Sequence, residues 1–294
     1  MPMLTTIRNS TLEATISTRG AELQSIRSAD GISYLWNGDP AHWSGRAPLL
    51  FPCVGALRDG RAMSEAGEVR LPQHGFACRM EWQLENVSDD RAAYRLDADD
   101  STRAGYPYDF SLRAEYRLGD HSVATILTVA NTGSRTLPYF LGGHPAFHVP
   151  LAEGESFEDY LLEFEQPETA DCPQVDLQHG LIMDTCRNRV LTESRTLPLN
   201  HALFRGDALI FDRLKSRSAR LFSPKSGRGV RMDFAGLDIF AVWSPAQDAP
   251  FVALEPWNGS GTQVSEDDVF EHKQCLRRLA PGQEDTVSFT VTVF

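Results

Sequence analysis

Two short segments each place one titratable side chain among glycine, proline and apolar residues. Residues 142–147 read Gly-Gly-His-Pro-Ala-Phe and contain His144, whereas residues 254–259 read Leu-Glu-Pro-Trp-Asn-Gly and contain Glu255. An imidazole and a carboxylate can transfer a proton to one oxygen of a substrate while removing a proton from another. The sequence therefore indicates paired acid–base chemistry by His144 and Glu255.

Alternation of apolar and polar residues predicts that β-strands hold these segments in place. Runs rich in β-branched and aromatic residues predict strands at residues 12–18, 123–129, 160–164, 219–222, 230–234, 239–243 and 286–294. Long helical periodicity is scarce, and the one short helix we predict, at residues 265–271, rests on a Ser-Glu-Asp-Asp start. We predict an all-β, antiparallel fold of two large sheets packed face to face, with a cleft on one concave side.

Length and composition restrict the class of protein. The 294 residues, 41% of them hydrophobic, can bury a large core, and the absence of repeats and linkers predicts a single domain over residues 1–294. The formal charge of -12 repels phosphate backbones and anionic lipids, so we expect no nucleic-acid or membrane partner. The first residues lack a basic and then apolar leader, and no run approaches about 20 apolar residues, so we expect a cytoplasmic protein.

Cysteine and histidine usage predicts neither a disulfide framework nor a metal site. The five cysteines are an odd number without a Cys-x-x-Cys spacing, and we expect reduced, mostly buried thiols. They are Cys53, Cys78, Cys172, Cys186 and Cys275. Five histidines show no metal-ligand spacing, and we interpret them as structural: His42, His121, His179, His201 and His272. We expect His148 to be exposed rather than part of a site.

Five motifs occur in order along nearly the whole chain. They are residues 20–23 (Gly-Ala-Glu-Leu), 46–55 (Arg-Ala-Pro-Leu-Leu-Phe-Pro-Cys-Val-Gly), 72–77 (Pro-Gln-His-Gly-Phe-Ala), 142–147 and 254–259. In this order they resemble the aldose 1-epimerase (galactose mutarotase) superfamily, and most closely its LacX-like subgroup. The resemblance implies a β-supersandwich fold, an isomerase that acts on a small-molecule hexose, and no cofactor.

The resemblance also implies roles for the two titratable residues. His144 matches the general acid that protonates the ring oxygen of the sugar, and Glu255 matches the general base that removes the proton from the C1 hydroxyl. Ring opening gives an aldehyde, rotation about the C1–C2 bond presents its other face, and reclosure yields the other anomer. The alternatives are a buried histidine satisfied by the backbone for His144 and a solvated acid for Glu255.

Five further residues are predicted to bind the sugar: Arg46, His74, Asp207, Trp243 and Trp257. Arg46 and His74 match family positions that contact sugar hydroxyls, although Arg46 could instead form a surface ion pair. Asp207 matches a family acid that accepts hydrogen bonds from hydroxyls, and Asp212 nearby is the alternative. The two tryptophans could offer flat apolar faces to the pyranose ring, or they could belong to the core.

One departure from the subgroup bears on the substrate. The subgroup often continues His-Gly-Phe-Ala with arginine, whereas here Cys78 stands at that place and Arg79 follows. On a strand, a shift of one residue points a side chain to the opposite face. Relatives that act on hexose 6-phosphates use additional arginines for the phosphate, so a hexose-6-phosphate 1-epimerase is an alternative that the sequence does not favour.

Two other functions are compatible with the same fold. A glycosidase normally needs two carboxylates, whereas the better pair here is a histidine and a carboxylate, so a glycosidase is not favoured. A sugar-binding or regulatory module would keep the cleft without turnover, and the presence of both His144 and Glu255 argues against it. We therefore expect an aldose 1-epimerase.

Overall fold

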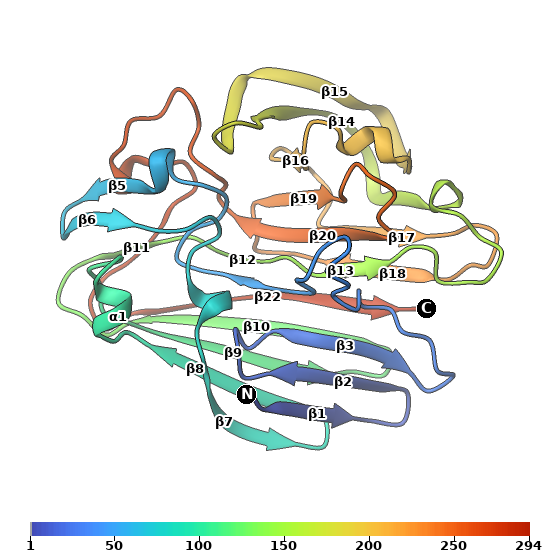
Figure 1. Cartoon of the computed structure of the whole chain (residues 1–294), viewed down its shortest axis with the longest axis horizontal. Helices are drawn as coiled ribbons and strands as arrows, with labels where there is room; N and C mark the ends of the chain where they lie inside the picture. Colours follow the sequence, from blue (N-terminus) through green and yellow to red (C-terminus); the bar gives the residue numbers. More distant parts are fainter. Residues whose placement is uncertain (1) are drawn as a thin grey trace.

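Antiparallel pairing connects most of the strands in residues 2–294, which the computed structural model describes (Figure 1). The largest sheet has nine strands. Their order is β15 (Leu181–Pro198), β14 (Leu161–Asp176), β17 (Ser218–Phe222), β18 (Gly229–Asp233), β22 (Glu284–Val293), β10 (Ser122–Asn131), β9 (Phe110–Leu118), β8 (Arg91–Asp97) and β7 (Gln83–Ser88). Each of these strands is antiparallel to its neighbours.

A second sheet has six strands, and smaller sheets flank the two. Its order is β16 (Leu209–Phe211), β19 (Ile239–Trp243), β20 (Phe251–Asn258), β12 (Leu141–Gly143) and β4 (Leu49–Leu50), and β13 (Ala146–His148) also pairs with β20. The smaller sheets are β1 (Leu4–Arg8), β2 (Leu12–Ser17) and β3 (Leu23–Ser28), then β5 (Arg61–Ser64) with β6 (Gly67–Arg70), and β11 (Leu137–Tyr139) with β21 (Arg277–Leu279).

Helical segments are few and short. They are the α-helix α1 (Asp100–Arg103) and the 3-10 turns η1 (Arg58–Gly60), η2 (Ala77–Arg79), η3 (Phe157–Asp159), η4 (His201–Phe204) and η5 (Phe270–His272). Among residues 2–294, no helix is long and apolar enough to cross a membrane.

The predicted antiparallel, all-β sandwich is confirmed, and each of the seven predicted strands coincides with an observed strand. The run at residues 160–164 is only the start of β14, which continues to Asp176 and pairs with β15 through several register shifts. The sequence did not predict β15, because many of its residues are exposed on both faces and give no clean alternation.

The predicted helix at residues 265–271 is wrong, since only the 3-10 turn η5 forms, beginning at Phe270. The acids that suggested a helix start bind loop backbone instead. Glu266 accepts hydrogen bonds from the N–H groups of Gln263 and Gln274, at 3.0 and 2.8 Å. Asp267 accepts one from the N–H of Val269 at 3.0 Å, as Asx turns do.

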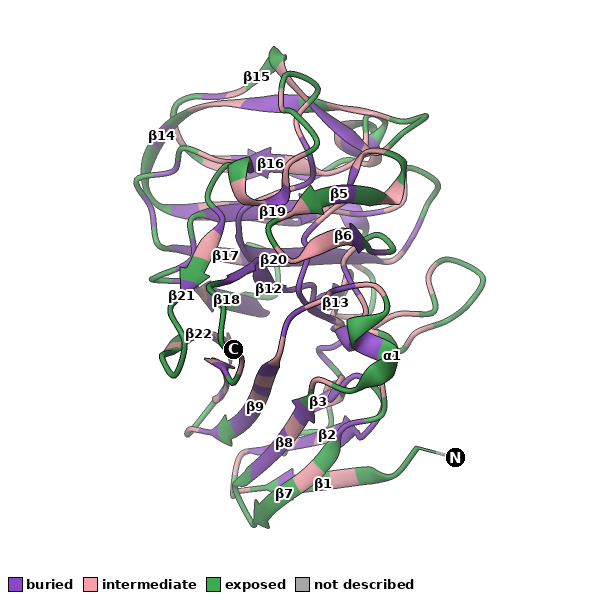
Figure 2. Cartoon of the chain, turned by 90° about the vertical axis from the view of Figure 1, so that its left-hand side faces the viewer, coloured by how far each residue is buried: buried purple, intermediate pink, exposed green. Residues whose placement is uncertain are grey.

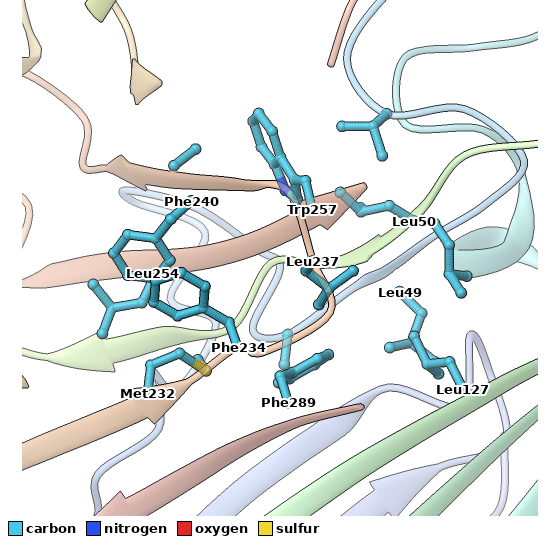
Figure 3. Packing of buried hydrophobic residues seen from close by; sticks show 14 of the residues in the cluster. Leu49, Leu50, Leu127, Met232, Phe234, Leu237, Phe240, Leu254, Trp257 and Phe289 are labelled. Atoms are coloured by element: carbon cyan, nitrogen blue, oxygen red, sulfur yellow. The ribbon is translucent and has the colours of Figure 1, made fainter. Parts of the chain in front are cut away.

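The hydrophobic core lies between the nine-stranded and six-stranded sheets (Figure 3). Leu127, Met232 and Phe289 enter it from β10, β18 and β22 of the larger sheet. Phe240 and Leu254 enter it from β19 and β20 of the smaller sheet. Every residue of β20 is buried, whereas the edge strand β7 is mostly exposed (Figure 2). The strand that carries the candidate base is therefore held rigidly at the centre of the molecule.

A glycine before the candidate acid allows β12 to lie close to the larger sheet. A Cβ atom on Gly143 would lie 2.5 Å from Cζ of Phe289, and that ring is itself 4% exposed. Because this separation is far below van der Waals contact, a larger residue would push β12 and Phe289 apart.

We expect Gly143→Ala to lower the free energy of unfolding by about 1–3 kcal/mol, the usual cost of adding atoms to a packed core. Urea denaturation would measure the loss. Gly206→Ala is the matched control, because a Cβ at Gly206 meets no atom within 4 Å. Equal stability of Gly143→Ala and Gly206→Ala would contradict this view of the packing.

Candidate active site

Strand register brings His144 and Glu255 together. His144 lies in the gap between β12 and β13, and both of these short strands pair with β20. The pairing of β12 with β20 ends at Trp257, and the pairing of β13 with β20 begins at Ala253. Glu255 therefore lies opposite the gap between β12 and β13. The N–H of Leu254 donates to the carbonyl of Pro145 at 2.9 Å and closes this junction. Trp257 points away from the face that carries Leu254 (Figure 3). Alternation along β20 places Glu255 on the same face as Trp257.

The two titratable side chains are in direct contact and almost fully buried. Nε2 of His144 lies 3.1 Å from Oε2 of Glu255, and the two residues are 8% and 1% exposed. The contact lacks the alignment of a hydrogen bond, and both Oε2 of Glu255 and Nδ1 of His144 are buried without a hydrogen-bond partner. The backbone of His144 is fixed, since its N–H donates to the carbonyl of Pro48 at 3.0 Å.

Burial favours the uncharged form of both groups. It lowers the pKa of His144 to about 3, with a further contribution from the nearby His74. Burial also raises the pKa of Glu255 well above its ordinary value, and the carboxyl group of Asp207 adds to this shift. Both shifts favour the uncharged pair, in which the shared titratable proton lies on Glu255 beside a neutral imidazole.

A cavity of about 750 Å³ opens over this pair. The predicted catalytic and binding residues that line it are His74, His144, Asp207, Trp243, Glu255 and Trp257. A volume of this size lies within the range of small-molecule sites and exceeds what a single pyranose ring needs. The cavity is therefore the candidate active site.

His74 is held at the cavity wall by its own backbone and by a glycine. Its φ is +64°, and its N–H donates to the carbonyl of Gly55 at 2.9 Å. The N–H of Gly55 donates in return to Nδ1 of His74 at 3.2 Å. Because burial and the charge of Arg79 lower the pKa of His74 to about 4, the ring is neutral and its Nε2 carries the proton. His74 therefore offers a hydrogen-bond donor.

Only one of the two candidate aspartates lines the cavity. Asp207 does so, its Oδ1 accepts from the N–H of Ala208 at 2.8 Å, and burial raises its pKa. Asp212 instead forms an ion pair with Arg187, whose Nη1 lies 3.0 Å from Oδ2. Of the two, Asp207 is the acid placed to meet a ligand.

Comparison with known proteins gives the family. The model of the family described as aldose 1-epimerase matches residues 3–290. The chain belongs to the aldose 1-epimerase family. It is 37% identical over 293 residues to "Protein LacX, plasmid" of Lactococcus lactis subsp. lactis, covering 98% of each chain. This relative has the LacX name of the predicted subgroup, which confirms the resemblance read from the five motifs.

Solved structures agree with this assignment to the aldose 1-epimerase family. The fold is similar to a galactose mutarotase related enzyme from Lactobacillus acidophilus, with a TM-score of 0.94, 29% identity, and coverage of 99% of this chain and 97% of that one. It is also similar to a galactose mutarotase-like protein from Lactobacillus casei, with a TM-score of 0.91, 29% identity, and coverage of 99% and 100%.

Arg46 is the one predicted binding residue of this epimerase-family chain that does not line the cavity. Its Nε donates to the carbonyl of Asn37 at 2.8 Å, and its Nη1 binds the side-chain oxygen of Gln24. Its backbone N–H donates to Glu22 at 2.9 Å. The structure therefore places the side chain of Arg46 in a local network and brings Glu22, which does line the cavity, into the site.

Cys78 and Arg79 both line the cavity, contrary to the expectation that a one-residue shift would separate them. That expectation assumed a strand, whereas these residues lie in the 3-10 turn η2, where neighbouring side chains need not point to opposite faces. Nη1 of Arg79 donates to the carbonyl of Gly75 at 2.6 Å. The rim of the site therefore carries a guanidinium group.

Sequence reasoning also missed Trp43. Its ring stacks on that of His144, with centroids 4.9 Å apart and planes inclined by 28°, and it lines the cavity. The residue belongs to no predicted strand and to none of the five motifs. Its position three residues before Arg46 was the only available signal.

The remaining expectations concern cysteines, metals and His148. The five cysteines are free, and the expectation of mostly buried thiols is wrong for Cys186 and Cys275, which are exposed on β15 and in the loop before β21. Among residues 2–294, no group of three or more His, Cys, Asp or Glu side chains is arranged to hold a metal ion. His148 is half-buried against Trp36, at a centroid distance of 5.2 Å, rather than exposed.

The depressed pKa of His144 predicts a pH dependence of stability. The unfolded chain binds a proton on this residue near pH 6.5, but the folded protein does so only near pH 3. As the pH falls through this window, the unfolded state therefore takes up the extra proton and stability is lost.

We expect the free energy of unfolding of wild type to fall more steeply with decreasing pH than that of His144→Gln, by at most about 1.4 kcal/mol per pH unit. Urea denaturation between pH about 4 and about 8 would measure both slopes. The raised pKa of Glu255 changes stability in the opposite direction as the pH falls, but Glu255 is present in both proteins, so the comparison isolates His144. Parallel curves would show that His144 is not held neutral by the fold.

Proposed function

We propose that the protein is an aldose 1-epimerase that interconverts the α and β anomers of a hexose. The observation that carries this proposal is the 3.1 Å contact between Nε2 of His144 and Oε2 of Glu255 at the wall of the cavity. Membership of the aldose 1-epimerase family supports it. An acid and a base so close together can serve the two neighbouring oxygens of a cyclic hemiacetal.

The reaction requires one proton to leave and another to arrive. Glu255, as carboxylate, removes the proton of the C1 hydroxyl while His144, as imidazolium, donates a proton to the ring oxygen. The bond between C1 and the ring oxygen breaks with its electron pair on the ring oxygen, and an aldehyde forms at C1. A half-turn about the C1–C2 bond precedes reclosure with the roles exchanged. Each transfer contributes about 10²–10⁴-fold.

Substrate binding prepares the charged form of the pair. Without substrate, burial disfavours both charges and so favours the proton on Glu255. Sugar hydroxyls that donate to Oε2, which has no donor of its own, stabilise the carboxylate. The proton can then move to His144 across the 3.1 Å contact. His74, Asp207, Trp243 and Trp257 are the groups we expect to hold the other hydroxyls and the ring face.

A hexose 6-phosphate is the second candidate substrate, and the two rim arginines favour it. Arg79 and Arg205 both line the cavity, and neither forms an ion pair with a carboxylate among residues 2–294. Guanidinium groups of this kind can bind phosphate oxygens.

The test is the optical rotation of freshly dissolved α-D-glucose, α-D-galactose and their 6-phosphates. We expect wild type to accelerate mutarotation of at least one of them, and we expect His144→Gln and Glu255→Gln each to lose about 10²-fold or more of that rate. His121→Gln and Glu153→Gln are matched controls on the surface and should keep it. Faster reaction of a 6-phosphate than of its free sugar would select the second candidate.

Absence of acceleration with all four sugars, in a folded wild type, would refute the proposal. Binding of a sugar without turnover would then assign the cavity to a sugar-binding module.

A further inference from the structure

His144 is oriented without the hydrogen bond that usually fixes a catalytic histidine. In most such sites the second ring nitrogen donates to a carbonyl or carboxylate, which sets both the tautomer and the ring direction. Here Nδ1 is buried and has no hydrogen-bond partner. Some other contact must therefore hold the imidazole with Nε2 toward Glu255.

Aromatic rings enclose the imidazole instead. The indole of Trp43 covers one face, with centroids 4.9 Å apart and an interplanar angle of 28°. Trp243 and His74 meet the ring edge-on, at 5.7 Å and 79° and at 5.6 Å and 84°. Trp43 is thus the ring that covers a face, and rotation of the imidazole about its Cβ–Cγ bond would drive it into the indole.

Trp43 is itself held firmly enough to serve as a support. Nε1 of Trp36 donates to the carbonyl of Trp43 at 2.8 Å. The indole also stacks on Phe251, at 5.7 Å and 27°. Trp43 packs against a small hydrophobic cluster that is separate from the main core and includes Trp36 and Phe251. A Cβ on Gly45 would lie 2.5 Å from the Trp43 ring, so the loop folds under the indole only with glycine there.

We propose that Trp43 is a positioning residue for His144. The indole face of Trp43 holds the imidazole of His144 so that its Nε2 points at Glu255. Its kinetic consequence rests on the proposed epimerase function, whereas its structural consequence does not. The indole face carries partial negative charge and also favours the imidazolium that the reaction needs. Stacking on Trp43 therefore raises the pKa of His144 and offsets part of the lowering that burial causes.

The experiment combines nuclear magnetic resonance with kinetics on Trp43→Leu and Trp43→Phe. The Hε1 proton of His144, identified by its absence in His144→Gln, lies in the ring current of the indole. We expect its resonance to move when Trp43 becomes leucine and to return toward the wild-type position with phenylalanine. Trp82→Leu is the control and should leave this resonance in place, because Trp82 is buried in the main core and does not line the cavity.

The kinetic arm uses whichever sugar wild type converts. We expect kcat to fall about 10²-fold in Trp43→Leu, as for a misplaced reacting group, with KM changing less and with recovery of most of kcat in Trp43→Phe. A change confined to KM, or a wild-type kcat in Trp43→Leu, would overturn the proposal. An unmoved His144 resonance in Trp43→Leu would overturn it as well.

The two arms separate this inference from the proposed function. If wild type converts no sugar, the resonance of His144 still decides whether Trp43 orients it. If Trp43→Leu fails to fold, Gly45→Ala displaces the indole while keeping it in the chain, and the same shift of the His144 resonance is expected.

Discussion

The close contact between two buried titratable side chains, His144 and Glu255, is the interaction on which the proposed function depends. Two buried charges would cost several kcal/mol each, so burial favours a neutral His144 beside a protonated Glu255. Such a pair needs rigid support, because a small displacement would separate it. The central strand β20 and the two short strands that meet on it provide that support.

The fold could be predicted, and His144 and Glu255 could be singled out as the candidate catalytic pair, because both leave local signals. Alternation of apolar and polar residues marks strands such as β22, whereas β19 is a short run of apolar and aromatic residues, and the buried residues of both strands fill the core. His144 and Glu255 lie in short motifs where glycine and proline restrict the backbone. For these residues, the type of side chain and its neighbours carry most of the information.

The rest of the site depends on geometry that no local pattern encodes. The register of β12 and β13 on β20 decides that His144 faces Glu255. Arg79 reaches the cavity because its segment turns instead of extending, and Trp43 does so because its loop folds back over Gly45. The side chain of Arg46 lies outside the cavity because it donates hydrogen bonds to Asn37 and Gln24. Each of these placements depends on a contact between segments distant in the sequence or on a turn that no local sequence motif marks.

Infrared difference spectroscopy tests the central claim most directly. The wild-type spectrum minus that of Glu255→Gln, recorded at neutral pH without sugar, isolates the carboxyl group of this one residue. The account predicts the carbonyl stretch of a protonated carboxylic acid in wild type, absent from Glu255→Gln and unchanged in Glu153→Gln. Carboxylate bands alone in that difference would show that Glu255 is ionised beside His144, which contradicts the one-proton, uncharged pair.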